Sequence, residues 1–323
     1  MIQDLSSTFL REDQGTVQDF LGIRIIKESL TKTIHMTRPG LIESIIQDVG
    51  LSDSSNIKYT LADSILHRDP SNTSRVDSWN YRSIIGKMNF LPQNTRPDIS
   101  FAVQQCDHFC TNPTHLHELA VKHIICYLQY TKDKGLQLQP TKDFTLDMYV
   151  NADFAGMQHH KFSALRENAL SRTGYIIAYC NCPIHWASKL QSEIALSTTE
   201  SEYIALSMAT RELLPLHCLL LELNQYSYIH VPLPDMFNTT KNTHLATSQI
   251  YEDNQACIVL ANSDQSKICT KHIAIKWHHF KDQIKHGHVK LIKVSSTSNW
   301  ADILTKPLTR QKHENLRKLI MGW

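Results

Sequence analysis

Residues 191–206 read QSEIALSTTESEYIAL, and the interpretation of the carboxyl-terminal half of the chain depends on this stretch. Short hydroxyl side chains at its centre precede a long run of residues without glycine. Such residues favour the start of a helix, so the sequence predicts a helix from about Thr199 to Leu223. Pro215 lies inside this range and is expected to kink the helix, because proline lacks the amide that an interior turn uses.

The start of this predicted helix can be capped in two registers. In the first, Ser197 and Glu200 form a capping box, in which the glutamate returns a hydrogen bond to the helix start. In the second, Thr199 and Glu202 form the box, and Glu200 is free to serve another purpose. The residues alone leave both registers open.

Strand and helix patterns alternate on both sides of the predicted helix. Before it, residues 144–150 alternate apolar with polar or small side chains, and a hairpin follows at 174–180 and 183–188. The polar stretch 225–247 is interpreted as an exposed insertion. The remaining predicted elements are a strand at 249–253, a helix at 254–262, a basic helix near 272–286, a strand at 288–294 and a helix from 300. This order predicts an α/β fold.

The amino-terminal half is predicted to be mostly helical. The expected elements are a strand at 19–26, a helix at 41–49 ended by Gly50, a loop at 59–78, and helices at 81–90, 99–110 and 113–130. The hydrophobic period changes near residue 140. Together with a length of 323 residues, this change predicts two domains, 1–140 and 144–323.

The composition is that of a chain that can bury a core. Hydrophobic residues make up 41% and charged residues 20%, and the net charge is +2, which neither indicates nor excludes a nucleic-acid partner. We find no signal-peptide pattern and no apolar run of about 18 residues, so we expect no membrane partner. The eight cysteines form no regular framework, and we expect reduced thiols in an intracellular protein of the cytoplasm or nucleus.

Five motifs in the carboxyl-terminal half identify a possible family. They are the opening stretch at 191–206, SRTGY at 171–175, YEDNQA at 251–256, TKHI at 270–273 and ADILTKPL at 301–308. Together, and in their order along the chain, they resemble the ribonuclease H domain of copia-type retrotransposon polyproteins. The resemblance implies a ribonuclease H-like mixed five-stranded sheet with flanking helices.

Three motifs upstream extend the resemblance. DFLGI at 19–23, YRSIIG at 81–86 and TRPDIS at 95–100 are similar to the part of copia-type reverse transcriptase that follows its catalytic palm. The resemblance implies that residues 1–140 are a reverse transcriptase tail. The string of tyrosine, any residue and two aspartates that carries polymerase metals does not occur here. We therefore expect no polymerase activity from this half, and a reverse transcriptase core as its partner.

Ribonuclease H chemistry requires carboxylates that converge on two Mg²⁺ or Mn²⁺ ions about 3.5–4 Å apart. By resemblance, Glu200, Asp253 and Asp302 are the metal ligands, and Asn151 and Asp153 complete the catalytic set. Each carboxylate also has an ordinary structural interpretation. Glu200 and Asp253 can cap helices, and Asp302 can interact with a helix dipole.

Asn151 departs from the family pattern, which has aspartate at this position. Asparagine keeps a carbonyl oxygen but loses the negative charge, so metal binding is expected to be weaker and cleavage impaired. Asp153 lies on the same face of the predicted strand. It is nevertheless displaced by roughly 6.5–7 Å along the strand, too far to replace the missing ligand.

The expected partner is an RNA–DNA hybrid, held by Arg172, Lys189, Lys271 and His272. A solvated helix face is the alternative interpretation for the basic stretch around Lys271. The leading hypothesis is an endonuclease of the ribonuclease H type, and the alternative is a catalytically inactive remnant that at most binds nucleic acid. An integrase of the same superfamily fits less well, because a reverse transcriptase-like segment precedes the domain. The cysteines and histidines between 106 and 126 lack the paired spacing of a zinc site.

Overall fold

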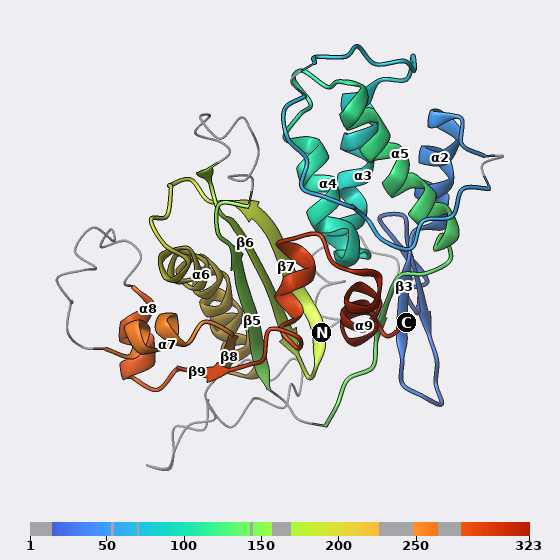
Figure 1. Cartoon of the computed structure of the whole chain (residues 1–323). Helices are drawn as coiled ribbons and strands as arrows, with labels where there is room; N and C mark the ends of the chain where they lie inside the picture. The colour runs from blue at the N-terminus through green and yellow to red at the C-terminus, as the bar shows by residue number, and fades with distance from the viewer. Residues whose placement is uncertain are drawn as a thin grey trace, which may run out of the picture.

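The computed structural model describes residues 15–52, 55–69, 71–142, 145–156, 169–225, 248–263 and 279–323. Two halves lie side by side, one mostly helical and one built around a larger sheet (Figure 1). The described part of the chain is therefore mixed α/β, as the sequence predicted.

The described residues of the amino-terminal half form a small antiparallel sheet and four α-helices. The strands are β1 (Asp19–Phe20), β2 (Ile23–Lys27), β3 (Ile34–Thr37) and β4 (Leu136–Leu138), paired in that order. The helices are α2 (Pro39–Val49), α3 (Tyr81–Asn94), α4 (Ser100–Asp107), preceded by the 3₁₀ helix η1 (Pro97–Ile99), and α5 (His115–Tyr130). Their apolar faces form one core.

Two sequence predictions for this half can be compared directly with the structure. The helix predicted to end at Gly50 does so, because Gly50 has a φ of 72°, a left-handed conformation that glycine adopts without strain. The single strand predicted at 19–26 is wrong. Leu21 and Gly22 have φ angles of 51° and 74°, and they form a turn between β1 and β2.

The carboxyl-terminal half is built on a five-stranded mixed sheet. Its elements are β5 (Leu146–Asp153), β6 (Arg172–Tyr179), β7 (Cys182–Leu190), α6 (Thr198–Gln225), β8 (Ser248–Glu252), α7 (Gln255–Asn262), α8 (Phe280–Lys285), β9 (Val289–Lys293), the 3₁₀ helix η6 (Trp300–Leu304) and α9 (Arg310–Met321). The strand order is β7-β6-β5-β8-β9. The first three strands pair antiparallel, whereas β5, β8 and β9 are parallel.

Helices cover both faces of this sheet. Met148 and Val150 of β5 pack with α6, α7 and α8 on one face. Tyr149 lies on the other face, where η6 and α9 pack, as expected for side chains that alternate along a strand. Figure 1 shows α6 and the pair η6–α9 on opposite sides of the sheet.

The end of the chain joins the two halves next to a buried ion pair of the amino-terminal half. Arg96 and Asp98 of the amino-terminal half are almost inaccessible to solvent and form two parallel hydrogen bonds of 2.9 and 2.8 Å. Tyr127 donates to Asp98 at 2.7 Å and accepts from Arg317 of α9 at 3.3 Å. The indole of Trp323 donates to the carbonyl of Gly135 at 2.6 Å. Helix α9 therefore belongs to both halves.

Several predicted elements differ from the structure or lie outside it. The helix predicted from residue 300 is two elements, η6 and α9. The predicted insertion falls on residues 226–247, and the first part of the predicted basic helix falls on 272–278; both ranges lie outside the described residues.

Candidate metal centre

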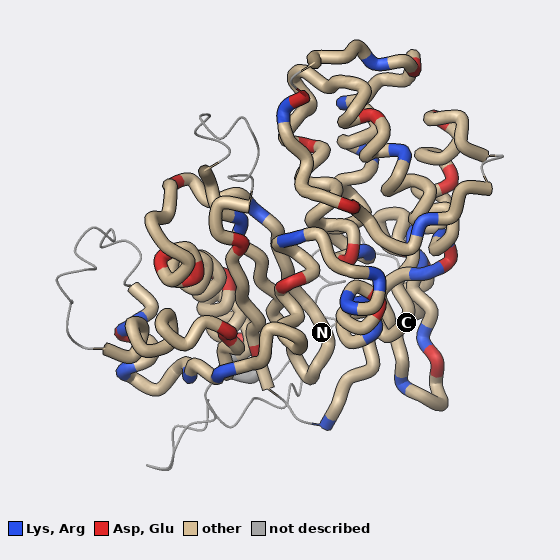
Figure 2. Tube along the Cα trace, in the orientation of Figure 1, with Lys and Arg blue, Asp and Glu red and all other residues tan. Residues whose placement is uncertain are grey.

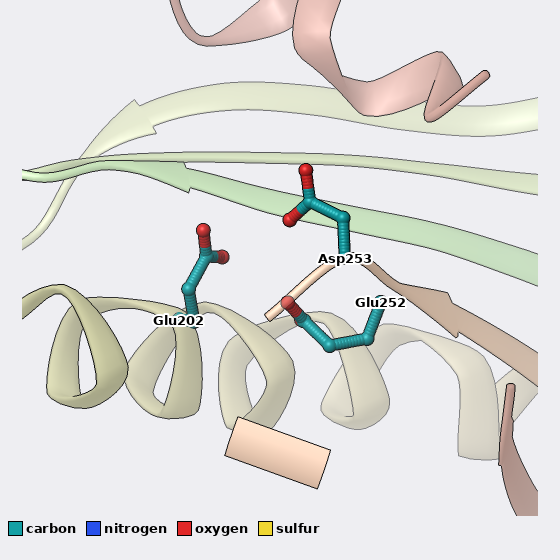
Figure 3. Close-up of side chains that lie close together, drawn as sticks. All are labelled: Glu202, Glu252 and Asp253. Atoms are coloured by element: carbon teal, nitrogen blue, oxygen red, sulfur yellow. The ribbon is translucent and has the colours of Figure 1, made fainter. Parts of the chain in front are cut away.

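Three carboxylates meet at the end of β8. Glu202 of α6, Glu252 of β8 and Asp253, which directly follows β8, each place a carboxylate oxygen within 4.8 Å of the other two. We call these three residues the acidic cluster. Figure 3 shows that Glu202 rises from the helix, while Glu252 and Asp253 approach from the end of the strand. It is the one group of this kind among the residues that the structure describes.

The start of α6 decides which glutamate joins the acidic cluster. The amide of Glu200 donates to the hydroxyl of Ser197 at 3.1 Å, and the carboxylate of Glu200 accepts from the amide of Leu196 at 2.8 Å. Glu200 therefore caps the helix, in the first of the two registers that the sequence left open. Glu202, not Glu200, is the glutamate in the cluster, because two residues along a helix point in clearly different directions.

Glu252 is completely buried, and sequence analysis did not select it. One of its oxygens accepts from the amide of Asn254 at 2.8 Å, and the other has no hydrogen-bond partner among the described residues. Burial raises the pKa of Glu252 to about 8, and the nearby Asp253 carboxylate adds to the rise. A signal was present in the sequence, since Glu252 occupies the same inward position as Ser248 and Ile250 in β8.

Glu202 resembles Glu252 in its burial, in its unpartnered oxygen and in its raised pKa. It is only 6% exposed, and one of its oxygens has no hydrogen-bond partner among the described residues. Burial raises its pKa well above the usual value, and Glu252 and Asp253 raise it further. The amide of Ala152 in β5 opposes this by donating a hydrogen bond. Lys306 also opposes the rise, but among the described residues no lysine or arginine forms an ion pair with the three carboxylates.

Asn151 is buried on β5, on the face of the sheet that carries Tyr149. Its side-chain amide donates to the hydroxyl of Thr305 at 2.6 Å, and that hydroxyl donates to the carbonyl of Asp302 at 3.3 Å. Asn151 is therefore linked to η6 and brings no charge to the site.

Asp302 is completely buried, but lysines balance its charge. One oxygen lies 2.7 Å from the ammonium of Lys306, and the other is paired with Lys312 of α9. Burial opposes the charged form of Lys306, but Asp302 outweighs this effect and the pKa of Lys306 is raised. Asp253 and Asp153 add to the rise, so the lysine lies within the electrostatic range of several carboxylates.

Asp153 and Arg172 are opposite each other on β5 and β6. Burial raises the pKa of Asp153, while Lys306 and Arg172 oppose the rise. Arg172 is only 7% exposed, donates to the hydroxyl of Ser188 at 3.2 Å and lies over the ring of Phe101. The guanidinium of Arg172 is thus enclosed by the protein, and its contact with a nucleic acid stays a prediction.

The other predicted nucleic-acid contacts remain predictions. Lys189 of β7 is exposed, whereas Lys271 and His272 lie outside the described residues. Figure 2 shows Lys and Arg interspersed with Asp and Glu along both halves of the described chain.

A glycine and an asparagine hold η6 against the sheet. A Cβ atom on Gly174 would lie 2.7 Å from Thr305 and 2.9 Å from Leu304, so glycine is required for this approach. The side chain of Asn299 accepts from the amide of Ala301 and donates to the carbonyl of Val150 at 2.8 Å. These contacts fix the position of Asp302 next to β5.

The acidic cluster fits a divalent cation. Hard cations such as Mg²⁺ and Mn²⁺ prefer carboxylate oxygens. Two buried oxygens, one on Glu202 and one on Glu252, have no hydrogen-bond partner among the described residues, and burying such groups is costly unless a cation or proton compensates. The donor set and these two atoms therefore point to the same kind of ligand.

No family model matches the chain. Curated relatives do match it along almost its whole length. It is 30% identical over 98% of its residues to the "Retrovirus-related Pol polyprotein from transposon TNT 1-94" of Nicotiana tabacum. It is 29% and 28% identical, over 99% and 98% of its residues, to the corresponding polyproteins from transposons RE1 and RE2 of Arabidopsis thaliana.

The chain spans about a fifth of these relatives, since the matches cover 22%, 20% and 20% of their lengths. Within the described residues, no helix combines the length and the apolar composition that a membrane span requires.

Proposed function

Because the chain is similar along almost its whole length to retrovirus-related Pol polyproteins of copia-type transposons, we propose that its carboxyl-terminal half is a ribonuclease H-like endonuclease. Its substrate is the RNA strand of an RNA–DNA hybrid, and its cofactor is Mg²⁺ or Mn²⁺. The observation that carries the proposal is the acidic cluster, with two buried carboxylate oxygens that lack a hydrogen-bond partner among the described residues.

We assign different roles to the acidic cluster and to the neighbouring pair of Lys306 and Asp302. Glu202, Glu252 and Asp253 bind a divalent cation at the end of β8. When bound, such a cation stabilises the charge that develops on the attacking and leaving oxygens of a phosphodiester. Lys306 and the paired Asp302 border the site and keep the carboxylates from repelling one another.

The neutral Asn151 supports a second candidate function. Its amide is already bound to Thr305, so this position contributes no negative charge to a metal site. An inactive remnant that binds nucleic acid without cutting it would have the same feature. The two functions differ in one measurable property, which is cleavage.

Cleavage of the labelled RNA strand of an RNA–DNA hybrid by the full chain tests the proposal. We expect cleavage with Mg²⁺ or Mn²⁺ and none with EDTA. Asp253→Asn should lower the rate by roughly 100-fold or more, because losing several kcal/mol of metal stabilisation has that effect. The exposed Asp133→Asn is the matched control and should keep the wild-type rate.

Asn151→Asp separates the two candidates. If the nuclease proposal holds, the added carboxylate should raise the cleavage rate and lower the Mg²⁺ concentration that half-saturates it. Cleavage that persists in EDTA or in Asp253→Asn would contradict the proposed metal site. Hybrid binding without cleavage, in both the wild type and Asn151→Asp, would favour the inactive remnant.

A further inference from the structure

The carboxylates around the candidate metal centre fall into two groups with different charge balance. The acidic cluster contains three carboxylates, two of which have an oxygen without a hydrogen-bond partner among the described residues. The only ammonium bound beside it among the described residues, that of Lys293, donates to the main-chain carbonyl of Asp253. Among the described residues no ion pair balances the carboxylates of this first group, so a proton or a metal cation must neutralise them.

The second group, Asp302 and Asp153, is surrounded by cations. Lys306 and Lys312 are paired with the two oxygens of Asp302, and Arg172 faces Asp153 across the strand pair. Three cations meet two carboxylates, so no negative charge is left over. A divalent cation entering beside Asp302 would have to displace an ammonium or lie next to one, and like charges at that range repel.

Lys306 is the cation that connects the two groups. Its ammonium lies 2.7 Å from Asp302, and the Asp253 carboxylate also interacts with it. It reaches this position from the segment that follows η6, which Gly174 and Asn299 hold against the sheet. The ammonium is thus a positive charge held at Asp302, within electrostatic range of Asp253.

Asn151, like the paired Asp302, offers no free negative charge to a second cation. A second divalent cation on this side of the site would depend on carboxylates at positions 151 and 302. Position 151 is neutral and its amide is bound to Thr305, and Asp302 is already paired. Neither residue offers an uncompensated charge.

We propose that the chain binds a single divalent cation, between Glu202, Glu252 and Asp253, and that the ammonium of Lys306 takes the place of a second cation. This inference rests on the proposed function for its metal. It adds that the site is built for one ion, and that Lys306 supplies the second positive charge near the scissile phosphate.

Counting bound ions tests the inference without any measurement of activity. The full chain, stripped with a chelator, is titrated with Mn²⁺, and free Mn²⁺ is followed by electron paramagnetic resonance. We expect the wild type to bind one ion, and Glu252→Gln to bind it at least about tenfold more weakly. The double variant Asn151→Asp/Lys306→Gln should bind two ions, because it gains a carboxylate and loses the competing ammonium.

The matched control is Asn151→Asp/Lys318→Gln, which makes the same change in net charge with an exposed lysine of α9. It should bind one ion. Circular dichroism checks the fold of each variant, and Lys306→Met replaces Lys306→Gln if that variant does not fold. Two ions in the wild type, or one ion in the folded double variant, would overturn the inference and leave the cleavage proposal standing. No bound ion at all would contradict both.

Discussion

The Arg96–Asp98 pair and the acidic cluster are both buried, but among the described residues the side chains of the pair have matching partners and those of the cluster do not. Asp98 receives two hydrogen bonds from Arg96 and one from Tyr127, so each charge is matched by its neighbours. Glu202 and Glu252 lie close together, and each keeps an oxygen with no hydrogen-bond partner among the described residues. The buried Arg96–Asp98 pair therefore serves the structure, whereas the buried carboxylates of the acidic cluster remain able to bind a cation.

The largest expected effect comes from breaking the matched pair. Asp98→Asn leaves the guanidinium of Arg96 buried without a counter-charge. Breaking a buried pair in this way costs about 3–5 kcal/mol, and urea denaturation followed by circular dichroism measures the loss. The control is Glu314→Gln, which breaks the exposed pair with Arg310 and should leave the unfolding midpoint nearly unchanged. Equal effects of the two changes would mean that the buried pair contributes no more than a surface pair.

The second expected effect is a pH dependence of stability to which the acidic cluster contributes and the Arg96–Asp98 pair does not. The pKa of Glu252 is raised to about 8 in the folded chain, so the folded state holds a proton that the unfolded state has lost. Stability therefore falls as pH rises from about 4.5 towards 8, by at most about 1.4 kcal/mol per pH unit for this group. Between about pH 7.5 and 8 the histidines do not obscure this trend, because His313 and His217, whose pKa values burial lowers to about 4, are then almost entirely neutral in the folded and the unfolded state.

Denaturation of the metal-free chain at several pH values in this window measures the slope. Glu252→Gln should flatten it, and saturating Mg²⁺ should remove it, because the cation replaces the proton. The Arg96–Asp98 pair should contribute nothing here, since the pKa of Asp98 is lowered. A slope that is unchanged in Glu252→Gln would show that other groups cause it.

A third effect of intermediate size is expected where η6 packs against the sheet. Gly174→Ala places a methyl group in contact with η6, 2.7 Å from Thr305 and 3.0 Å from the carbonyl of Ala301. Overpacking of this kind costs about 1–3 kcal/mol, and thermal unfolding measures it. Gly86→Ala is the matched change in the helical half. Nothing lies within 4 Å of its added methyl group, so it should stabilise α3 by about 0.5–1 kcal/mol. Destabilisation of the same size at both positions would argue against the close approach at Gly174.

The smallest effect separates the two glutamates at the start of α6. Glu200→Ala removes a helix cap and should cost about 1 kcal/mol while leaving Mn²⁺ affinity unchanged. Glu202→Gln should do the opposite, with weaker Mn²⁺ binding and no loss of stability in the metal-free chain. Denaturation and Mn²⁺ titration of both variants provide the comparison. A loss of Mn²⁺ affinity in Glu200→Ala would return Glu200 to the metal site.

The sequence predicted the parts of the fold that depend on local periodicity. The long helix α6, the strands of the five-stranded sheet and the helix end at Gly50 all follow from patterns within a few residues. The turn at Leu21 and Gly22 was missed because the apolar pattern continues across it. The two-part ending in η6 and α9 was missed because the length of a helix depends on its packing partners.

The site was harder to predict, because it depends on contacts between distant residues. Asp253 could be predicted from its motif, but of the two glutamates the resemblance selected Glu200, and only the contact with Leu196 shows that Glu200 caps the helix. Glu252 looked like a neighbour of Asp253 and not a member of the cluster, because its burial depends on α6. The pairing of Lys306 and Lys312 with Asp302 connects side chains that a single sequence does not relate.

The hydrogen bond between Asn151 and Thr305 has a direction, and the direction has a consequence for mutation. The amide donates, so the hydroxyl proton of Thr305 is left for the carbonyl of Asp302. An aspartate at 151 can only accept, and it would be satisfied if that hydroxyl turned toward it. Asparagine and aspartate codons differ by one nucleotide. A single base change could therefore restore a carboxylate here with no more movement than the rotation of one hydroxyl group, so this position can gain or lose its charge without disturbing the backbone around it.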